Sequence, residues 1–241
     1  MFKNIFLFFF TLSLNLLAYI NIYPITFDKP IDGNGSKEEF ILYNKTKNPI
    51  RYSISLNDTG IKNSMKEWVE YYPKNITVKP GKSEKIKVFI KAPKYAQKGE
   101  YLTTLEIKEN LVPSLEKTPP KNGVQILTHL KMDIAGFIGD IKPKFKINNF
   151  SITPSNKNLN VKGSIENIGE RRGKVDIILT NGSKRDEYLL GSIRVLKNEK
   201  IDLSKLSHEL ENKAQEKKIK SYKKLIIREQ GSNRNITEIL L

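Results

Sequence analysis

Few residues of this sequence have the types and spacing that catalysis or metal binding requires. The chain has two histidines, His129 and His208, and neither belongs to an H-x-x-x-H or H-E-x-x-H metal motif. There is no G-x-S-x-G nucleophile elbow, and no glycine-rich phosphate loop or dinucleotide fingerprint. The chain also lacks cysteine, so it has no thiol nucleophile and no thiolate metal site. We therefore predict that the protein is not an enzyme and uses no metal or cofactor, and catalysis is kept as an alternative.

One segment, residues 124–134 (VQILTHLKMDI), has a pattern that indicates binding. Its apolar residues alternate, and Val124, Ile126 and Leu130 lie on one face of the predicted strand. If this strand lies at the edge of a sheet, its free N–H and C=O groups can pair with a strand of another protein. The three side chains would then fill successive pockets of that partner, which is recognition by β-augmentation. A plain sandwich strand with an inward apolar face shows the same alternation, so both interpretations remain open.

The charge and composition limit the choice of partner. The chain of 241 residues has a net charge of +16, from 42 basic and 26 acidic side chains. Most basic residues are lysines spread along the chain, without an aromatic–basic cluster, so we predict no nucleic-acid binding. Weak attraction to an anionic lipid, a polysaccharide or an acidic protein is compatible with this charge. The 38% of apolar residues is enough for packed cores.

The first eighteen residues have the features of a signal peptide. Lys3 gives a positive start, Ile5–Leu17 is almost continuously apolar, and Ala18 is a small residue at a cleavage position. The apolar run is shorter than the roughly 20 residues of a membrane-spanning helix. We predict an exported, periplasmic protein with residues 1–18 removed; a retained N-terminal anchor is the alternative.

Short strands separated by turn residues follow the signal and predict the fold. Residues 67–107 combine an aromatic strand, the Pro80-Gly81 turn and two alternating strands, a spacing typical of an antiparallel β-sandwich. Glycines and a proline between residues 135 and 143 predict a hinge. We expect an all-β protein of two immunoglobulin-like β-sandwich domains joined by a short hinge, with an N-terminal domain at 19–138 and a C-terminal domain at 139–241.

The strands of the second domain are less regular. We expect six of them, and Asn181-Gly182 predicts a two-residue hairpin of type I′ because both residues tolerate positive φ. Residues 204–219 are charged and fit either a short helix or an extended loop. The six predicted strands are 144–152, 159–166, 174–179, 188–195, 222–229 and 235–241.

The order of these features resembles the periplasmic chaperones of chaperone–usher pilus assembly. That family has two immunoglobulin-like domains, and the motifs of its first domain are similar to residues 20–134 of this chain. The similar segments are Val69–Pro73, Val78–Gly81, Ile86–Pro93, Tyr101–Ile107 with Val112-Pro113, and Val124–Leu127 followed by Lys131.

The resemblance implies a function and a site. In the family, the alternating residues of the last strand of domain one are donated to an incomplete pilin subunit, and here these would be Val124, Ile126 and Leu130. A basic pair binds the terminal carboxylate of the subunit, and Lys131 matches one of the two. The other is an arginine of the first strand, where residues 20–31 offer only Lys29.

We therefore expect a chaperone that caps secreted pilin-like or surface subunits by donating this strand, with an outer-membrane usher as a further partner. The alternative is a structural or adhesive surface protein built of immunoglobulin-like modules.

Overall fold

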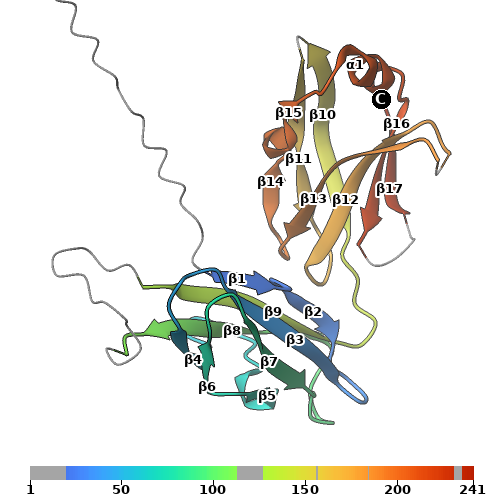
Figure 1. Ribbon diagram of the computed structural model, residues 1–241. Coiled ribbons are helices and arrows are strands. Elements are labelled where there is room, and N and C mark those ends of the chain that lie inside the picture. The colour runs from blue at the N-terminus through green and yellow to red at the C-terminus, as the bar shows by residue number, and fades with distance from the viewer. Residues whose placement is uncertain (1–19, 113–126, 156, 184, 231–234) are drawn as a thin grey trace, which may run out of the picture.

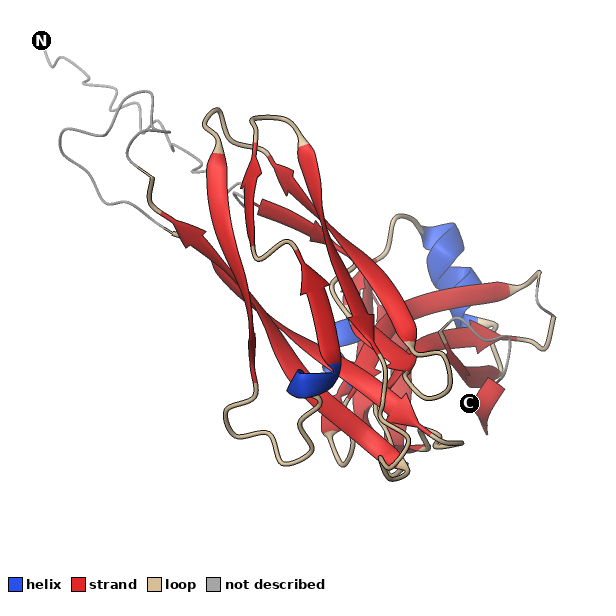
Figure 2. Ribbon diagram, turned by 90° about the horizontal axis from the view of Figure 1, so that it is seen from below, coloured by secondary structure: helices blue, strands red, loops and turns tan. Residues whose placement is uncertain are grey.

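The computed structural model describes residues 20–112 and 127–241, apart from residues 156, 184 and 231–234. Within this range strands dominate (Figure 2). They form four sheets, which pair into two β-sandwiches with separate buried cores (Figure 1). This confirms the predicted all-β fold of two sandwiches. Val124 and Ile126 lie outside the described residues, as does the predicted signal peptide.

In the residues that the structure describes, the first sandwich is made of nine strands in two sheets. Its pairs are antiparallel except β2–β9, which is parallel. One sheet has the order β1 (Ile20–Tyr23), β3 (Ser36–Asn44), β7 (Ser83–Ile90) and β5 (Val69–Tyr72). The other has the order β2 (Phe27–Pro30), β9 (His129–Ile138), β8 (Gly99–Asn110), β4 (Ile50–Asn57) and β6 (Asn75–Val78), and a 3-10 helix spans Lys66–Trp68.

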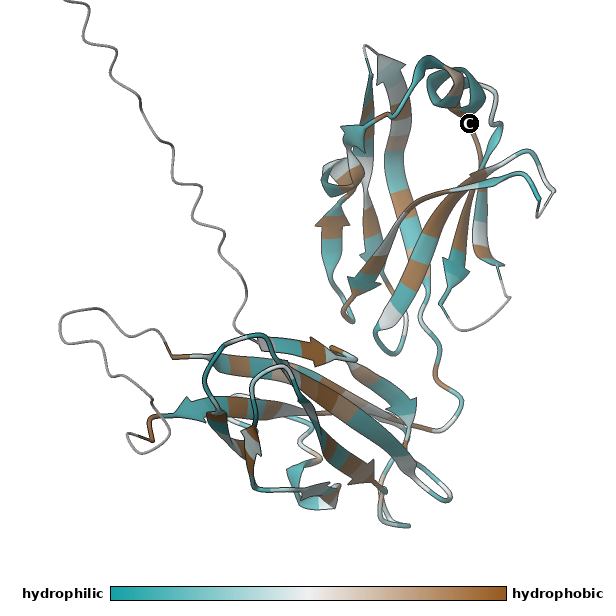
Figure 3. Cartoon of the chain, in the orientation of Figure 1, coloured by the Kyte–Doolittle hydropathy of each residue, from teal (hydrophilic) through white to brown (hydrophobic). Residues whose placement is uncertain are grey.

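Alternation of apolar residues explains why these segments form strands. In β7, Ile86, Val88 and Ile90 are buried while the residues between them are exposed. Successive side chains of a strand point to opposite faces, so one face enters the core. The brown and teal bands along the strands in Figure 3 show the same pattern.

The second sandwich has the predicted antiparallel character with more irregular connections. One sheet has the order β10 (Phe145–Ser155), β11 (Asn158–Asn167) and β14 (Lys200–Asp202), and β15 (His208–Glu209) also pairs with β11. The other has the order β13 (Glu187–Val195), β12 (Gly173–Thr180), β16 (Lys224–Glu229) and β17 (Asn235–Leu240).

The charged segment 204–219, which the sequence predicted to be either a helix or a loop, contains helical residues and a short strand. A 3-10 helix spans Leu203–Leu206, and α1 spans Lys213–Lys220. The side chain of Asn212 accepts a hydrogen bond from the backbone N–H of Gln215 and so caps α1. No helix in the described part of the chain is long and apolar enough to cross a membrane.

Two local predictions were wrong. The predicted hairpin at Asn181-Gly182 is present, because β12 and β13 pair antiparallel. Residues 181–186 join the two strands and Asn181 does not have positive φ, so the turn is not the predicted two-residue turn of type I′. The predicted hinge begins too early, because β9 continues to Ile138. Ala135 and Phe137 are buried and pack with Ile141, which keeps this segment in the sheet.

The first described segment, residues 20–30, is divided at Pro24 into two strands. Residues before it form β1, an edge strand of one sheet, and residues after Thr26 form β2, an edge strand of the other sheet. Proline has no N–H group to donate to a ladder, so an edge is where it is tolerated. The chain thus changes sheets next to β9.

Candidate functional site

Strand β9 has different neighbours along its two edges. On one side it pairs with β8 from His129 to Ile138. On the other side β2 pairs with Ile134–Phe137 only. Within the described part of the chain, residues 129–133 therefore have no strand on this second side. Such an edge presents unpaired backbone donors and acceptors to another chain.

A depression lies beside this free edge. Its wall on one side is formed by the segment that joins β1 to β2, and on the other by β9 itself. Ile25 has 64% of its surface exposed there, although it is a large apolar residue. The lining residues are Ile22, Ile25, Thr26, Leu130, Lys131, Met132, Asp133 and Arg194. An exposed apolar side chain beside an unpaired edge is suited to binding an extended chain.

The side chains of β9 alternate between the core and the surface. Met132 and Ile134 are buried in the first core, and Leu130 is half-buried against it. Lys131 and Asp133 point to the outer face and are exposed. Leu130, predicted to contact a partner, thus packs against the core of its own domain.

Lys131 is exposed and paired within the protein. Its Nζ lies 3.4 Å from Oε1 of Glu106, and Nε2 of His129 lies 3.4 Å from Oε2 of the same carboxylate. The amide of Asn57 donates a third hydrogen bond to Glu106, at 3.0 Å. Chiefly through this amide, and then through Lys131 and His129, the pKa of Glu106 is lowered. The ammonium group of Lys131 is therefore already paired with the carboxylate of Glu106.

Arginines of the second sandwich, which the sequence analysis did not identify, also reach this region. Arg194 on β13 donates to both carboxylate oxygens of Asp28 on β2, at 2.8 and 2.7 Å. This bidentate geometry is the strong form of an arginine–carboxylate pair. The two residues are 166 positions apart in the sequence, so no local pattern could reveal their contact.

A second pair joins the sandwiches nearby. Arg172 is buried, and its Nε and backbone N–H both donate to Oε1 of Glu100, at 2.8 and 2.9 Å. Among the described residues its Nη1 has no hydrogen-bond partner, and it lies 3.9 Å from Oδ2 of Asp133. The guanidinium of Arg171 lies 4.7 Å from the centre of the Phe137 ring, within range of a cation–π contact. These contacts hold the second sandwich against the outer face of the sheet that contains β9.

The described residues include no group of three or more His, Asp or Glu side chains placed to hold a metal ion. The chemistry that this region offers is the pairing of backbone groups, apolar contact and a small number of charges.

The comparisons with known proteins define a fold class. Residues 39–118 match a family model described as the IG-like fold at the C-terminal of FixG. The description names an oxidoreductase, and the match concerns the IG-like part alone. None of the curated proteins compared with the chain matches it.

The solved structures that the chain resembles include pilus-assembly chaperones. The YadV chaperone is 15% identical, with 92% of this chain and 100% of that chain covered and a TM-score of 0.46. A chain of the Salmonella enterica complex of SafA pilin and SafB chaperone is 10% identical, with 92% and 96% covered and a TM-score of 0.45. A chain of the Acinetobacter baumannii CsuC–CsuE complex of a chaperone and a tip subunit is 15% identical, with 92% and 97% covered and a TM-score of 0.42.

Proposed function

We propose that this protein is an exported chaperone that binds secreted, pilin-like subunits by pairing one of their extended segments with the free edge of β9. The observation that carries the proposal is that residues 129–133 lack a strand neighbour on one side, among the residues that the structure describes, and border a depression with the exposed Ile25. The resemblance of residues 20–134 to pilus-assembly chaperones agrees with it.

Backbone pairing supplies the affinity in this mechanism. A client strand laid along His129–Asp133 would satisfy the free N–H and C=O groups and extend the sheet by one strand. Exposed apolar residues of the client would contact Ile25 and Ile22. Val124 and Ile126 would extend the donated strand at its beginning, as the sequence predicts.

The charges would then orient the client. Lys131 and Arg194 both line the depression and are both paired with carboxylates of this protein. A carboxylate of the client would share or displace Glu106 as the partner of Lys131. The proposal also includes export to the periplasm with residues 1–18 as the signal, and hand-over of the client to an outer-membrane usher.

Substitution of Ile25 tests this site without disturbing a core. Ile25→Asp places a charge beside the free edge, and we expect the variant to fold and to lose capture of clients from the periplasmic fraction of the source cells. Tyr95→Asp is the matched control, because Tyr95 is 83% exposed and lies outside the depression. Capture is read out by co-purification and mass spectrometry of the bound proteins.

A second variant tests the donated strand. Ile126→Asp should also abolish co-purification, while the circular dichroism spectrum and thermal melting stay unchanged. Undiminished capture by both variants would show that the client binds elsewhere. Stable location of the protein on the cell exterior would instead favour a structural or adhesive surface module.

A further inference from the structure

The sheet on the far side of the first sandwich has an unusually apolar outer face. Several large apolar side chains point outward from β1, β3, β5 or β7, and each has at least 36% of its surface exposed. These residues are Tyr23, Ile41, Tyr43, Tyr72 and Phe89. The contacts of Arg172 and Arg194 with the first sandwich fall on the opposite sheet. Exposed apolar clusters of this kind mark interaction surfaces.

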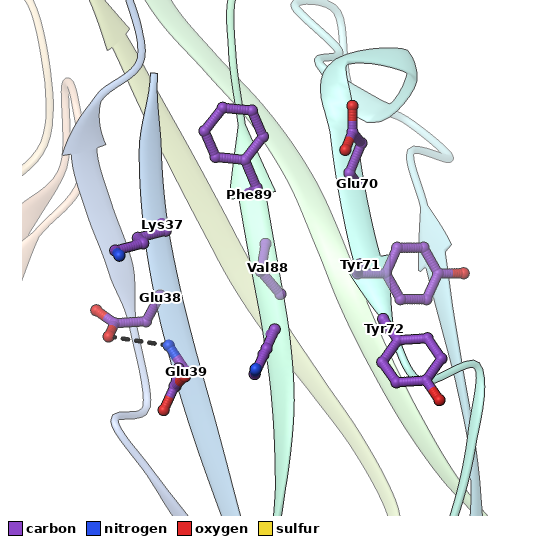
Figure 4. Close-up of a pocket in the computed structure, with 9 residues that line it drawn as sticks. Lys37, Glu38, Glu39, Glu70, Tyr71, Tyr72, Val88 and Phe89 are labelled. Atoms are coloured by element: carbon purple, nitrogen blue, oxygen red, sulfur yellow. Dashed lines mark hydrogen bonds between the residues drawn. The ribbon is translucent and has the colours of Figure 1, made fainter. Parts of the chain in front are cut away.

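The registers of the strands place charged residues around the ring of Phe89. In one row across the sheet, Lys37 and Glu70 flank Phe89. In the adjacent row, Glu39 and Tyr72 flank Lys87. We call these six residues the outer-face cluster. Figure 4 shows Lys37 and Glu39 on β3, Phe89 on β7, and Glu70 and Tyr72 on β5, gathered around one shallow groove.

Three charges of the outer-face cluster make no ion pair among the described residues, although the pKa of Glu39 is lowered by Lys85 and then, through their charge, by Lys87 and Lys37. Lys37, Lys87 and Glu70 make no ion pair there, whereas Glu39 binds Lys85 at 2.7 Å. The unpaired charges include both signs, although the whole chain has a net charge of +16. A uniformly acidic or basic partner would satisfy one sign and oppose the other.

A second copy of this chain offers each of these charges a complementary group. Consider a two-fold axis that is parallel to the sheet, lies midway between two facing sheets, and runs across the strands between the two rows; this axis exchanges the rows. Lys37 then faces Glu39 of the second copy, Phe89 faces its Lys87, and Glu70 faces its Tyr72. Each contact occurs twice, which is the pattern of an isologous interface.

The chemistry of these contacts is favourable in each case. Lys37 and Glu39 have opposite charges, an ammonium over the Phe89 ring is a cation–π contact, and the Tyr72 hydroxyl can donate to the Glu70 carboxylate. The axis also runs the strands of the two copies in opposite directions, which is compatible with aligned face-to-face packing of sheets.

We infer that the outer-face cluster of β3, β5 and β7 is a homodimer interface, in which two copies pack these sheets together about that axis. The free edge of β9 belongs to the other sheet and stays open in this dimer. The inference therefore does not rest on the proposed function, and the two are tested separately.

Charge reversal at two positions tests the dimer. Sedimentation velocity of the full chain over a series of concentrations should show wild-type protein shifting to twice the monomer mass. Lys37→Glu and Glu39→Lys should each abolish the shift, since each places like charges in contact twice. An equimolar mixture of the two variants should regain the dimer. In the mixed dimer both contacts between positions 37 and 39 again join a carboxylate to an ammonium, because the two substituted side chains face each other and the two unchanged side chains do the same.

Two further variants complete the test. Lys217→Glu, an equal change of charge on α1, should leave the dimer intact. Phe89→Ser keeps every charge and should still abolish dimerisation. This variant tests the interface even if a charge reversal impairs folding. A wild-type chain that stays monomeric at all concentrations overturns the inference, as does a Phe89→Ser variant that still dimerises. Failure of the mixture of two folded variants to regain the dimer also overturns it.

Discussion

Between Ile134 and Phe137, strand β9 pairs with a neighbouring strand on both sides. Between His129 and Asp133 it pairs on one side only, within the part of the chain that the structure describes. In the first part the side chains are enclosed: Ile134 and Ala135 are fully buried, and Phe137 is covered by Arg171 of the second sandwich. In the second part only Met132 is buried, and the charged residues are exposed. A single strand thus combines a fixed half with an open half.

The difference shows how the protein can present an unpaired edge without losing its fold. The enclosed half anchors β9 in the core and against the second sandwich, so the open half is kept extended by continuity of the strand and by β8. In the proposed function, a client would find the edge already in the conformation that pairing requires, which would lower the entropic cost of binding.

The largest expected effect is in the enclosed half. Ile134→Ala removes a fully buried side chain from the first core, and substitutions of this kind cost about 2–5 kcal/mol in free energy of unfolding. Denaturant unfolding measures it. The matched change in the open half is Leu130→Ala, whose side chain is half-buried and whose loss should cost clearly less. Equal losses at the two positions would contradict the division of β9 into halves.

A smaller effect is expected where the second sandwich contacts the enclosed half. Arg172→Ala leaves the carboxylate of Glu100, which is 9% exposed, without its cation. Loss of one partner from a buried hydrogen bond costs about 1–3 kcal/mol, and the two sandwiches should also become less fixed in relative orientation. Unfolding and small-angle scattering measure these two effects. Arg185→Ala, at an exposed arginine, should change neither quantity.

The smallest effect concerns the charges of the open half. The folded pKa of Glu106 is lowered below its usual value by Asn57, Lys131 and His129. Its contribution to stability is therefore complete above the ordinary carboxyl pKa and is lost as the pH falls through the folded value. Glu106→Gln should flatten the pH dependence of the melting temperature in the acid range. A wild-type profile that is already flat there would show that this cluster contributes nothing to stability.

The sequence allowed the strands of both sandwiches to be predicted where apolar alternation is strong. Ile86, Val88 and Ile90 illustrate this, because side chains that are two residues apart in a strand point to the same face and are buried together. Short strands such as β14 and β15 were missed, since two or three residues cannot show a period. The type of turn predicted after Thr180 was wrong, because the loop is longer than two residues and Asn181 lies outside the positive-φ region.

The candidate site was predicted only in part. The alternation around Leu130 and Lys131 directed attention to β9, but it could not distinguish a free edge from a paired one. That distinction depends on where β2 ends, which is a property of the folded sheet. The ion pairs of Arg194 with Asp28 and of Arg172 with Glu100 join distant parts of the chain. The sequence has many acidic residues, so it could not show which of them each arginine would contact.

Hydrogen–deuterium exchange of the β9 backbone tests the central claim most directly. In the free protein, amides of residues 129–133 that point away from β8 should exchange faster than those of residues 134–137, which are paired on both sides. When a captured client is bound, the amides of 129–133 should become protected and those of 134–137 should change little. Slow exchange of 129–133 in the free protein, or no added protection on client binding, would contradict the assignment of this edge as the client site.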